Sequence, residues 1–228
     1  MGGVGDDDDT EQGGSAPCWL HELGPDGTVV DPRQAEDVAR WRKAERERLL
    51  AARAALSPES RAQQTAAMAA DLERLIPGDA PQTVSAYWPI RAEPDLRAWM
   101  RSRSEGGTRI ALPVALALGQ PLVFREWRPG ARLAHGLWRI PYPADGAEVT
   151  PTVVLAPVVG FDGLCYRLGY GGGFFDRTLA VLRPRPLVIG VGYGCGAIRT
   201  IFPQPHDIPM DWIVTGASPA RPRTAAPS

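Results

Sequence analysis

Residues 152–193 have the sequence TVVLAPVVGFDGLCYRLGYGGGFFDRTLAVLRPRPLVIGVGY, and this stretch decides the fold. The runs TVVLAPVV and PLVIGVGY at its two ends are continuously apolar, as expected for strands that are covered on both faces. Between them a glycine-rich turn leads into a segment where Phe175, Leu179 and Leu182 recur at the spacing of an amphipathic helix. The stretch therefore predicts a strand, a turn, a helix and a second, parallel strand.

The sequence on the amino-terminal side predicts two helices. Aspartate followed by proline at residues 31–32 suits a helix start, and we predict a long helix over residues 33–56. The Ser-Pro-Glu sequence at 57–59 ends this helix and caps the next one. The second helix presents one apolar face, made by Met68, Leu72, Leu75 and Ile76.

From residue 83 onward, short β-rich runs alternate with helical segments. Besides the two runs already quoted, these are TVSAYW, RIALPVAL, PLVFREW and DWIVT, and the EPDLRAWM segment predicts a helix between the first two. Such alternation favours a three-layer α/β/α fold with a mostly parallel sheet. We expect one domain over residues 31–216, a disordered acidic extension over 1–30 and a flexible tail over 217–228.

Composition and charge argue against several classes of protein. A net charge of −1 over 228 residues does not suit a general nucleic-acid binder, which needs a basic excess. No apolar run approaches the roughly 20 residues that cross a bilayer. Cys18, Cys165 and Cys195 form no CxxC or Cys/His cluster, so neither a zinc site nor a disulfide framework is supported. We therefore expect a cytoplasmic protein with no nucleic-acid or membrane partner.

The glycine-rich turn is the strongest candidate site in the sequence. Without Cβ atoms, its glycines let backbone N–H groups approach an anion, and the helix that follows adds a partial positive charge. Arg167 and Arg177 flank the turn, and guanidinium groups match phosphate oxygens. The turn has neither the G-x-G-x-x-G nor the G-x-x-x-x-G-K-[ST] pattern. The alternative is a flexible glycine turn without a ligand.

Two arginines on the first helix are a second candidate. Arg42 and Arg46 lie one turn apart on one face, where like charges repel each other. Glu45 can neutralise Arg42, but no acidic residue stands three or four positions from Arg46. An unneutralised basic pair suits a bound anion, and the alternative is a solvated arginine face.

Aromatic and acidic residues mark two further places. Tyr87 and Trp88 lead into Glu93, and an aromatic shelf beside a carboxylate could stack a flat heterocycle and accept its N–H donors. The alternative makes the aromatics core residues and Glu93 a helix cap. Asp207 and Asp211 precede the last strand, where aspartates often hold Mg²⁺ with substrate phosphates or serve as turn residues.

Taken together, these segments resemble the 5-formyltetrahydrofolate cyclo-ligase family, also called methenyltetrahydrofolate synthetase. The resemblance runs from about Arg42 to Thr215. It depends on four segments in order: an R-x-x-x-R helix leading into ALSPESR, then YWPIRAEPDL, FD-x-x-x-x-RLGYGGGFFDR and HDIPMDWIVT. The third segment is highly specific, and the others convince through their order and spacing.

The resemblance implies a ligase of one-carbon metabolism that turns 5-formyltetrahydrofolate into 5,10-methenyltetrahydrofolate, using ATP and Mg²⁺ and releasing ADP and phosphate. It also implies a scaffold like that of sugar-phosphate isomerases and CoA transferases, and we expect a monomer whose partner is the small-molecule substrate. The implied ATP-binding positions are Arg42, Arg46, Arg167, Leu168, Gly169, Tyr170, Gly171, Gly172, Gly173, Phe174 and Phe175. The implied folate-binding positions are Trp88, Glu93, Tyr170, Gly171, Gly172, Gly173 and Phe174. Arg167 and Glu93 are the implied catalytic residues, and the implied magnesium ligands are Asp176 and Asp211.

The chain departs from the family pattern at a few positions. Cys165 stands where the family usually has glycine, so we expect a different entry turn. Phe174 and Phe175 replace a tyrosine pair but keep its stacking surface, and Gly172 replaces the lysine of eukaryotic members. Two alternative functions stay open: an inactive relative that binds folate or nucleotide, and a sugar-phosphate isomerase or acyl-transferring enzyme on the same type of scaffold.

Overall fold

The computed structural model describes residues 32–78 and 82–224, so the acidic extension predicted over 1–30 lies outside the described residues. Two compact units follow one another along the chain, residues 1–40 and 41–228, and each is described by itself. In the first unit, the described residues form the opening turns of helix α1 (Pro32–Ala54), where Arg40 pairs with Asp37. Everything that follows concerns the second unit, and the single domain over 31–216 stays a prediction.

A seven-stranded sheet organises the second unit, in the order β11-β10-β9-β6-β1-β2-β3. The central strands β10, β9, β6, β1 and β2 run parallel, and the edge strands β11 and β3 run antiparallel to their neighbours. Their bounds are β1 Thr83–Ser85, β2 Arg109–Val114, β3 Val123–Trp127, β6 Val153–Pro157, β9 Leu187–Val191, β10 Trp212–Val214 and β11 Arg221–Pro222. The mostly parallel sheet confirms the predicted fold class.

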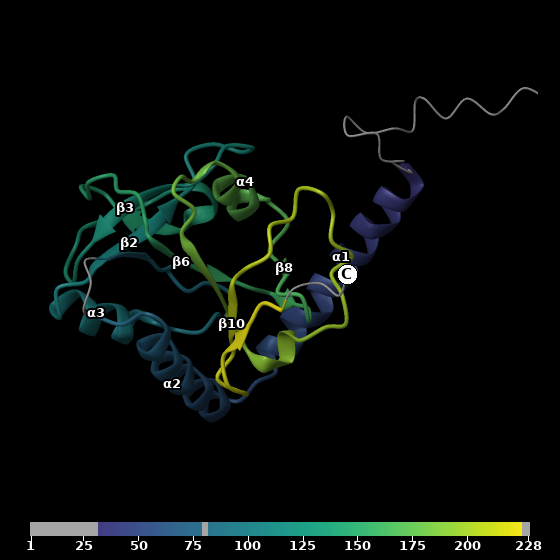
Figure 1. Ribbon diagram of the computed structural model, residues 1–228, viewed down its shortest axis with the longest axis horizontal. Helices are drawn as coiled ribbons and strands as arrows, with labels where there is room; N and C mark the ends of the chain where they lie inside the picture. Colours follow the sequence, from purple (N-terminus) through teal and green to yellow (C-terminus); the bar gives the residue numbers. More distant parts are fainter. Residues whose placement is uncertain (1–31, 79–81, 225–228) are drawn as a thin grey trace, which may run out of the picture. The chain divides into compact units, whose positions relative to one another are not determined.

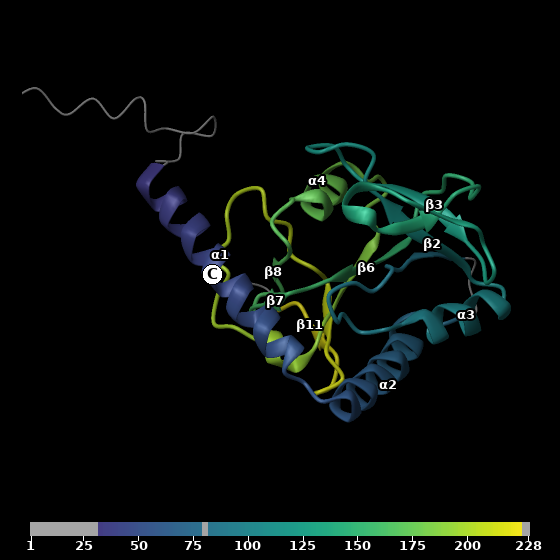
Figure 2. The same cartoon turned by 180° about the vertical axis from the view of Figure 1, so that it is seen from behind.

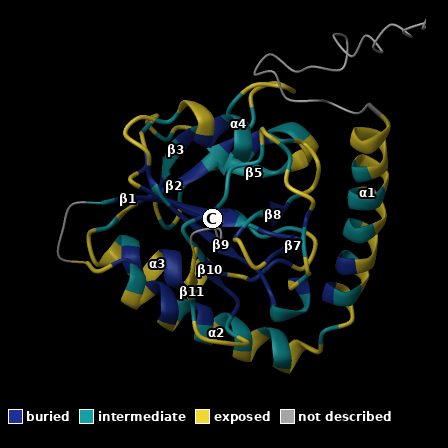
Figure 3. Cartoon of the chain, turned by 45° about the vertical axis from the view of Figure 1, so that its right-hand side comes forward, coloured by how far each residue is buried: buried dark blue, intermediate teal, exposed yellow. Residues whose placement is uncertain are grey.

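Helices cover both faces of this sheet. On one side lie α2 (Pro58–Leu75) and α3 (Arg97–Glu105), and on the other lies α4 (Phe174–Val181), as Figures 1 and 2 show. The pleat of the strands explains the layers, because successive side chains point to opposite faces. Within β6, Val153 and Leu155 pack in the cluster that includes residues of α2 and α3, whereas Ala156 packs with residues of α4. Figure 3 shows the central strands of the sheet as largely buried, and β1, β6 and β9 are the most buried of them.

Local sequence accounts for the helix starts. The Ser57 side chain accepts a 3.1 Å hydrogen bond from the Ser60 backbone N–H and caps α2, with Pro58 in its first turn. The helix predicted over EPDLRAWM begins later, because α3 starts at Arg97 after the irregular residues 93–96. Among the helices of the described residues, none combines the length and apolar character that a membrane span needs.

Three smaller features complete the fold. β4 (Leu133–His135) and β5 (Pro141–Pro143) form a hairpin whose tip is the 3₁₀ turn η2 (Leu137–Arg139), and β7 (Gly160–Phe161) pairs with β8 (Arg167–Leu168). A second 3₁₀ turn, η3, covers Gly194–Gly196. We placed a flexible tail after residue 216, but β11 lies in that region and pairs antiparallel with β10. Arg221 in β11 also donates a 2.7 Å hydrogen bond to the Asp162 carbonyl.

Candidate active site

The glycine-rich turn, residues 169–173, joins β8 to the first residue of α4. Gly171 and Gly173 have φ values of +95° and +63°, in the left-handed region that favours glycine. Gly173 is the N-cap of α4, and no side chain caps it. The first N–H groups of the helix are therefore directed toward the turn, and the helix amino terminus favours negative charge. This geometry is compatible with the predicted phosphate cradle, which stays a prediction.

Arg46 lies directly against this turn. Its Nε donates a 2.8 Å hydrogen bond to the Gly169 carbonyl. Its guanidinium carbon is 3.3 Å from the point where a Cβ on Gly171 would stand. Burial and then the neighbouring charge of Arg42 lower the pKa of Arg46 below its usual value. No described carboxylate forms an ion pair with it, so the positive charge at the turn is available to an anion.

Arg42 lies in different surroundings. It forms an ion pair with Asp207 at 2.5 Å and donates hydrogen bonds to the carbonyls of Ile201 and Phe202 at 2.9 and 2.8 Å. The prediction that Glu45 neutralises Arg42 is wrong, because Glu45 pairs with Arg48 at 2.5 Å. Arg42 thus fixes the second unit's part of α1 to the segment 201–207.

Arg167 and Arg177 flank the turn, each with one unsatisfied donor. Arg167 is buried and donates a 2.6 Å hydrogen bond to Asp176, while its Nε has no partner. Arg177 donates to the Gly172 carbonyl, and its Nε also lacks a partner. Their guanidinium groups lie over the rings of Phe175 and Phe174, at 5.1 and 5.4 Å. The rings of the two phenylalanines therefore stack against arginine side chains of the protein itself.

The two aspartates predicted to bind Mg²⁺ differ in position. Asp176, in the first turn of α4, accepts hydrogen bonds from the Arg167 guanidinium and, at 3.3 Å, from the Ile208 backbone N–H. Asp211 forms an ion pair with Arg185 at 2.8 Å and accepts a 2.8 Å hydrogen bond from the Val188 N–H in β9. Within residues 32–78 and 82–224, no three His, Cys, Asp or Glu side chains gather as a metal cluster. One carboxylate with substrate phosphates suffices for Mg²⁺, and Asp176 fits that task. The contacts of Asp211 instead tie it to β9.

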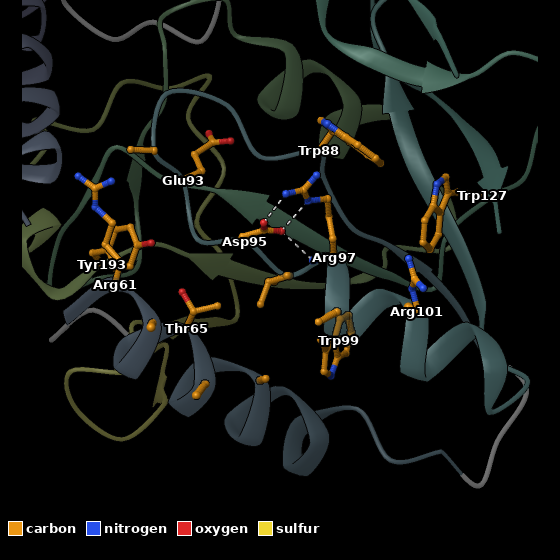
Figure 4. Close-up of a pocket in the computed structure, with 16 residues that line it drawn as sticks. Arg61, Thr65, Trp88, Glu93, Asp95, Arg97, Trp99, Arg101, Trp127 and Tyr193 are labelled. Atoms are coloured by element: carbon orange, nitrogen blue, oxygen red, sulfur yellow. Dashed lines mark hydrogen bonds and ion pairs between the residues drawn. The ribbon is translucent and has the colours of Figure 1, made fainter. Parts of the chain in front are cut away.

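A cavity of about 940 Å³ lies between α2, the segment 88–97, α3 and the end of β3. Figure 4 shows Trp88 and Trp127 on one side of it and Glu93 and Tyr193 on the other. The aromatic walls suit a flat ring system, and a buried carboxylate can accept its N–H donors. The predicted shelf of Trp88 and Glu93 therefore opens into a real cavity.

The alternative roles of this segment can now be compared. Tyr87 is buried in the core and donates to the Pro94 carbonyl at 3.0 Å, so the core alternative holds for Tyr87. The helix-cap alternative for Glu93 is wrong, because the N-cap of α3 is Leu96. Glu93 instead accepts the Ile90 backbone N–H at 2.9 Å. Its pKa is raised, chiefly by burial and against the effect of its hydrogen bonds.

The glycine-rich turn and the cavity adjoin through one side chain. The Tyr170 hydroxyl donates a 2.9 Å hydrogen bond to Glu93, which lines the cavity. Sequence reasoning missed the second partner of this hydroxyl, Arg53, which lies 3.1 Å from it. The available signal was spacing, because Arg53 stands seven residues after Arg46 and so on the same helix face.

Two other local features were not foreseen. Trp138, at the tip of the β4–β5 hairpin, is 62% exposed and meets the Phe174 ring edge-on at 5.3 Å. It has a φ of +56°, a strained value for a bulky residue. Cys165 has a φ of +64°, so the entry turn keeps a glycine-like backbone conformation where we expected a different one. The carboxylate of Asp162 supports this turn by accepting the N–H groups of Leu164 and Tyr166.

Comparisons with known proteins agree on one family. The sequence model of the 5-formyltetrahydrofolate cyclo-ligase family matches residues 38–216. The chain is 35% identical over 142 residues to the 5-formyltetrahydrofolate cyclo-ligase of Mycolicibacterium smegmatis, covering 59% of this chain and 73% of the relative. It is 29% identical over 171 residues to the Escherichia coli enzyme of the same name, covering 72% and 93%.

Solved structures give the same result. The solution structure of Aquifex aeolicus 5,10-methenyltetrahydrofolate synthetase matches with a TM-score of 0.69 and 26% identity, covering 82% of this chain and 95% of that one. A 5,10-methenyltetrahydrofolate synthetase from Mycoplasma pneumoniae matches with a TM-score of 0.64 and covers 77% and 98%. At 21% identity the latter shows likeness of fold alone.

Proposed function

The chain belongs to the 5-formyltetrahydrofolate cyclo-ligase family, and we propose that it catalyses the ATP-dependent cyclisation of 5-formyltetrahydrofolate to 5,10-methenyltetrahydrofolate, releasing ADP and phosphate. One observation carries the proposal. The glycine-rich turn lies next to the aromatic cavity, because Tyr170 in the turn donates a hydrogen bond to Glu93, which lines the cavity. A triphosphate bound at the turn would then lie beside a flat heterocycle in the cavity, as a phosphoryl transfer between them requires.

The nucleotide side of the proposal depends on the turn and its arginines. Arg46 and Arg167 would offset the charge of the phosphates, and the N–H groups near Gly173 would donate to their oxygens. Arg42 is a weaker candidate for phosphate contact, because its bonds to residues 201–207 already hold its guanidinium. The remaining proposed contacts of ATP are Leu168, Gly169, Tyr170, Gly171, Gly172, Phe174 and Phe175.

The folate side depends on Trp88 and Glu93. The Trp88 ring lines the cavity and offers a stacking surface, and Glu93 offers a carboxylate for the N–H groups of the pterin. Burial makes this carboxylate selective, because an acceptor withdrawn from water gains most from a donor on the ligand. The turn from Tyr170 to Phe174 adjoins the cavity through the Tyr170–Glu93 hydrogen bond, and we propose that the formyl group lies on that side.

The chemistry follows from the poor leaving ability of an amide-like formyl oxygen. The formyl oxygen attacks the γ-phosphorus of ATP, the bond to the bridging oxygen breaks, and ADP leaves. The aniline nitrogen of the folate then attacks the activated carbon, loses its proton, and inorganic phosphate departs with the former formyl oxygen. The protein's part is to position the two substrates and to stabilise phosphate charge through Arg46 and Arg167.

Mg²⁺ belongs to the same proposal. When bound, it would reduce the negative charge of the phosphates, and Asp176 is the carboxylate beside the turn that would hold it. Arg167 would then exchange its bond to Asp176 for a phosphate oxygen. Asp211 stays a prediction that no contact of the structure supports.

We also propose that the protein acts as a monomer in the cytoplasm. Cys165 and Cys195 are free, and free thiols suit a reducing compartment. Light scattering of the purified protein tests the monomeric state. The proposed small-molecule partner of the protein is the folate substrate.

The test is direct. Purified protein is mixed with 5-formyltetrahydrofolate, ATP and Mg²⁺, and the absorbance of methenyltetrahydrofolate is followed together with release of ADP. We expect the two products in equal amounts, and no product without ATP. Binding of both substrates without product would favour an inactive relative. Turnover of a sugar phosphate or an acyl donor without nucleotide would favour the isomerase or transferase alternative.

A further inference from the structure

Arg53 is a buried cation without a direct anionic partner. Only 2% of its surface is exposed, and its hydrogen bonds go to the Val158 carbonyl and to the Tyr170 hydroxyl. No described carboxylate forms an ion pair with it. An isolated buried charge is strongly unfavourable, so its compensation has to come from nearby.

Glu93 is a buried carboxyl group on the other side of the same hydroxyl. Its exposure is 6%, and its hydrogen bonds come from the Ile90 N–H and from the Tyr170 hydroxyl. Within the described residues it also has no direct ion pair. Among residues 32–78 and 82–224, Tyr170 is the group that hydrogen-bonds both Arg53 and Glu93.

The chemistry of the three groups fixes the direction of these bonds. A guanidinium can only donate and an ionised carboxylate can only accept. The Tyr170 hydroxyl therefore accepts from Arg53 at 3.1 Å and donates to Glu93 at 2.9 Å. Hydrogen bonds in such a chain polarise one another, so the cation strengthens the donor that reaches the carboxylate.

We propose that Arg53 and Tyr170 are positioning residues that hold the Glu93 carboxylate ionised and directed into the folate cavity. This inference rests on the function proposed above, because it assigns Glu93 to the substrate. It explains why a charged arginine is buried at position 53, where an apolar side chain would avoid the cost of burying a charge. It also links the two halves of the site, since Tyr170 belongs to the glycine-rich turn and Glu93 lines the cavity shown in Figure 4.

Several charged or titratable groups surround Glu93. Arg53 faces it from α1, Tyr170 from the glycine-rich turn and Arg91 from its own segment, and the buried Tyr87 lies close by. Burial raises the pKa of Glu93, whereas the Ile90 and Tyr170 hydrogen bonds and the two arginine charges lower it. Substrate binding needs the ionised form, so activity should fall as the pH drops through this pKa. Removal of a hydrogen bond that lowers the pKa must move the fall to higher pH.

The experiment measures kcat/KM for 5-formyltetrahydrofolate against pH, at saturating ATP, in the wild type and in Tyr170→Phe. We expect the acid limb of the Tyr170→Phe profile to move up by about one pH unit. The matched control is Tyr142→Phe, which removes a hydroxyl from β5 and should leave the profile unchanged. Arg53→Lys keeps the charge and should move the limb less than Arg53→Met.

Each outcome decides something. A uniform loss of kcat in Tyr170→Phe with an unmoved acid limb would overturn the inference, and this variant should fold because Tyr170 is 36% exposed. A ¹³C-carboxyl NMR titration of Glu93 in the wild type and in Tyr170→Phe gives a second readout that needs no turnover. If the titration moves but the wild type forms no methenyltetrahydrofolate, the proposed function fails while the positioning of Glu93 stands.

Discussion

Arg42 and Arg46 lie one helical turn apart on α1, yet their removal should have opposite consequences. Arg46 has no described anionic partner and lies against the glycine-rich turn. Arg46→Ala should therefore leave the fold nearly intact and remove a charged donor from ATP. Such a contact contributes about 1.5–3 kcal/mol, which corresponds to roughly a 10- to 150-fold weaker Kd.

Arg42→Ala should act mainly on stability. The side chains of Arg42 and Asp207 are 11% and 8% exposed, so the substitution leaves a nearly buried carboxylate without its cation. Breaking such a pair costs about 3 kcal/mol, at the lower end for buried pairs because some water reaches both groups. For a chain of this size that is a fall in Tm of roughly 6–12 °C.

The ion pair also gives a pH signature. Burial disfavours the ionised form of Asp207, but the bond and charge of Arg42, the Gln204 N–H and the charge of His206 together lower its pKa. A carboxyl whose pKa is lowered on folding stabilises fully above its unfolded pKa of about 3.9 and loses that stabilisation as pH falls further. The free energy of unfolding of the wild type should fall below about pH 4. In Arg42→Ala this fall should be smaller, because the Arg42 bond that lowers the pKa of Asp207 is missing.

Calorimetry of ATP binding and thermal unfolding measure the two effects on the same samples. Arg48→Ala is the matched control, since Arg48 is an exposed arginine of the same helix, paired with Glu45, and should change neither quantity much. The reasoning is refuted if Arg46→Ala lowers Tm as far as Arg42→Ala does. It is refuted equally if Arg42→Ala weakens ATP binding as strongly as Arg46→Ala with Tm unchanged.

Two further predictions concern the turn and the metal. Gly171→Ala places a Cβ at a φ of +95° and 3.3 Å from the Arg46 guanidinium, so we expect about 1 kcal/mol or more of strain and weaker ATP binding, seen in unfolding and calorimetry. Asp176→Asn should raise the Mg²⁺ concentration needed for half-maximal activity. Asp211→Asn should lower Tm and leave that concentration unchanged, and the reverse pattern would restore Asp211 as the ligand.

The sequence was sufficient for features that depend on local pattern. The apolar runs and the 3.6-residue period of residues 152–193 predicted β6, the turn, α4 and β9, because strand pleat and helix pitch are local properties. The absence of an acidic neighbour around Arg46 on its own helix was also visible in the sequence. The aromatic residues beside Glu93 were also visible in the sequence, and Trp88 and Glu93 both line one cavity of the structure.

Contacts between distant segments could not be found in this way. Arg42 and Asp207 are separated by 165 positions, and no periodicity connects them. The sequence suggested that Glu45 pairs with Arg42, but Glu45 pairs with Arg48, which is also three positions away from it. The start of α3 was misplaced for a related reason, since Glu93 accepts a bond within its own turn instead of capping the helix.

The three arginines of α1 show why spacing alone does not assign a role. Arg42, Arg46 and Arg53 share one helix face, but each meets a different group on the segments packed against it. The carboxylate of Asp207 neutralises Arg42, whereas the carbonyl that Arg46 bonds leaves its charge uncompensated. Arg53 bonds the Tyr170 hydroxyl, which in turn donates to Glu93. A charge that a protein anion already compensates contributes less to binding a ligand, which is why we propose Arg46 for the nucleotide and an indirect role, through Glu93, for Arg53.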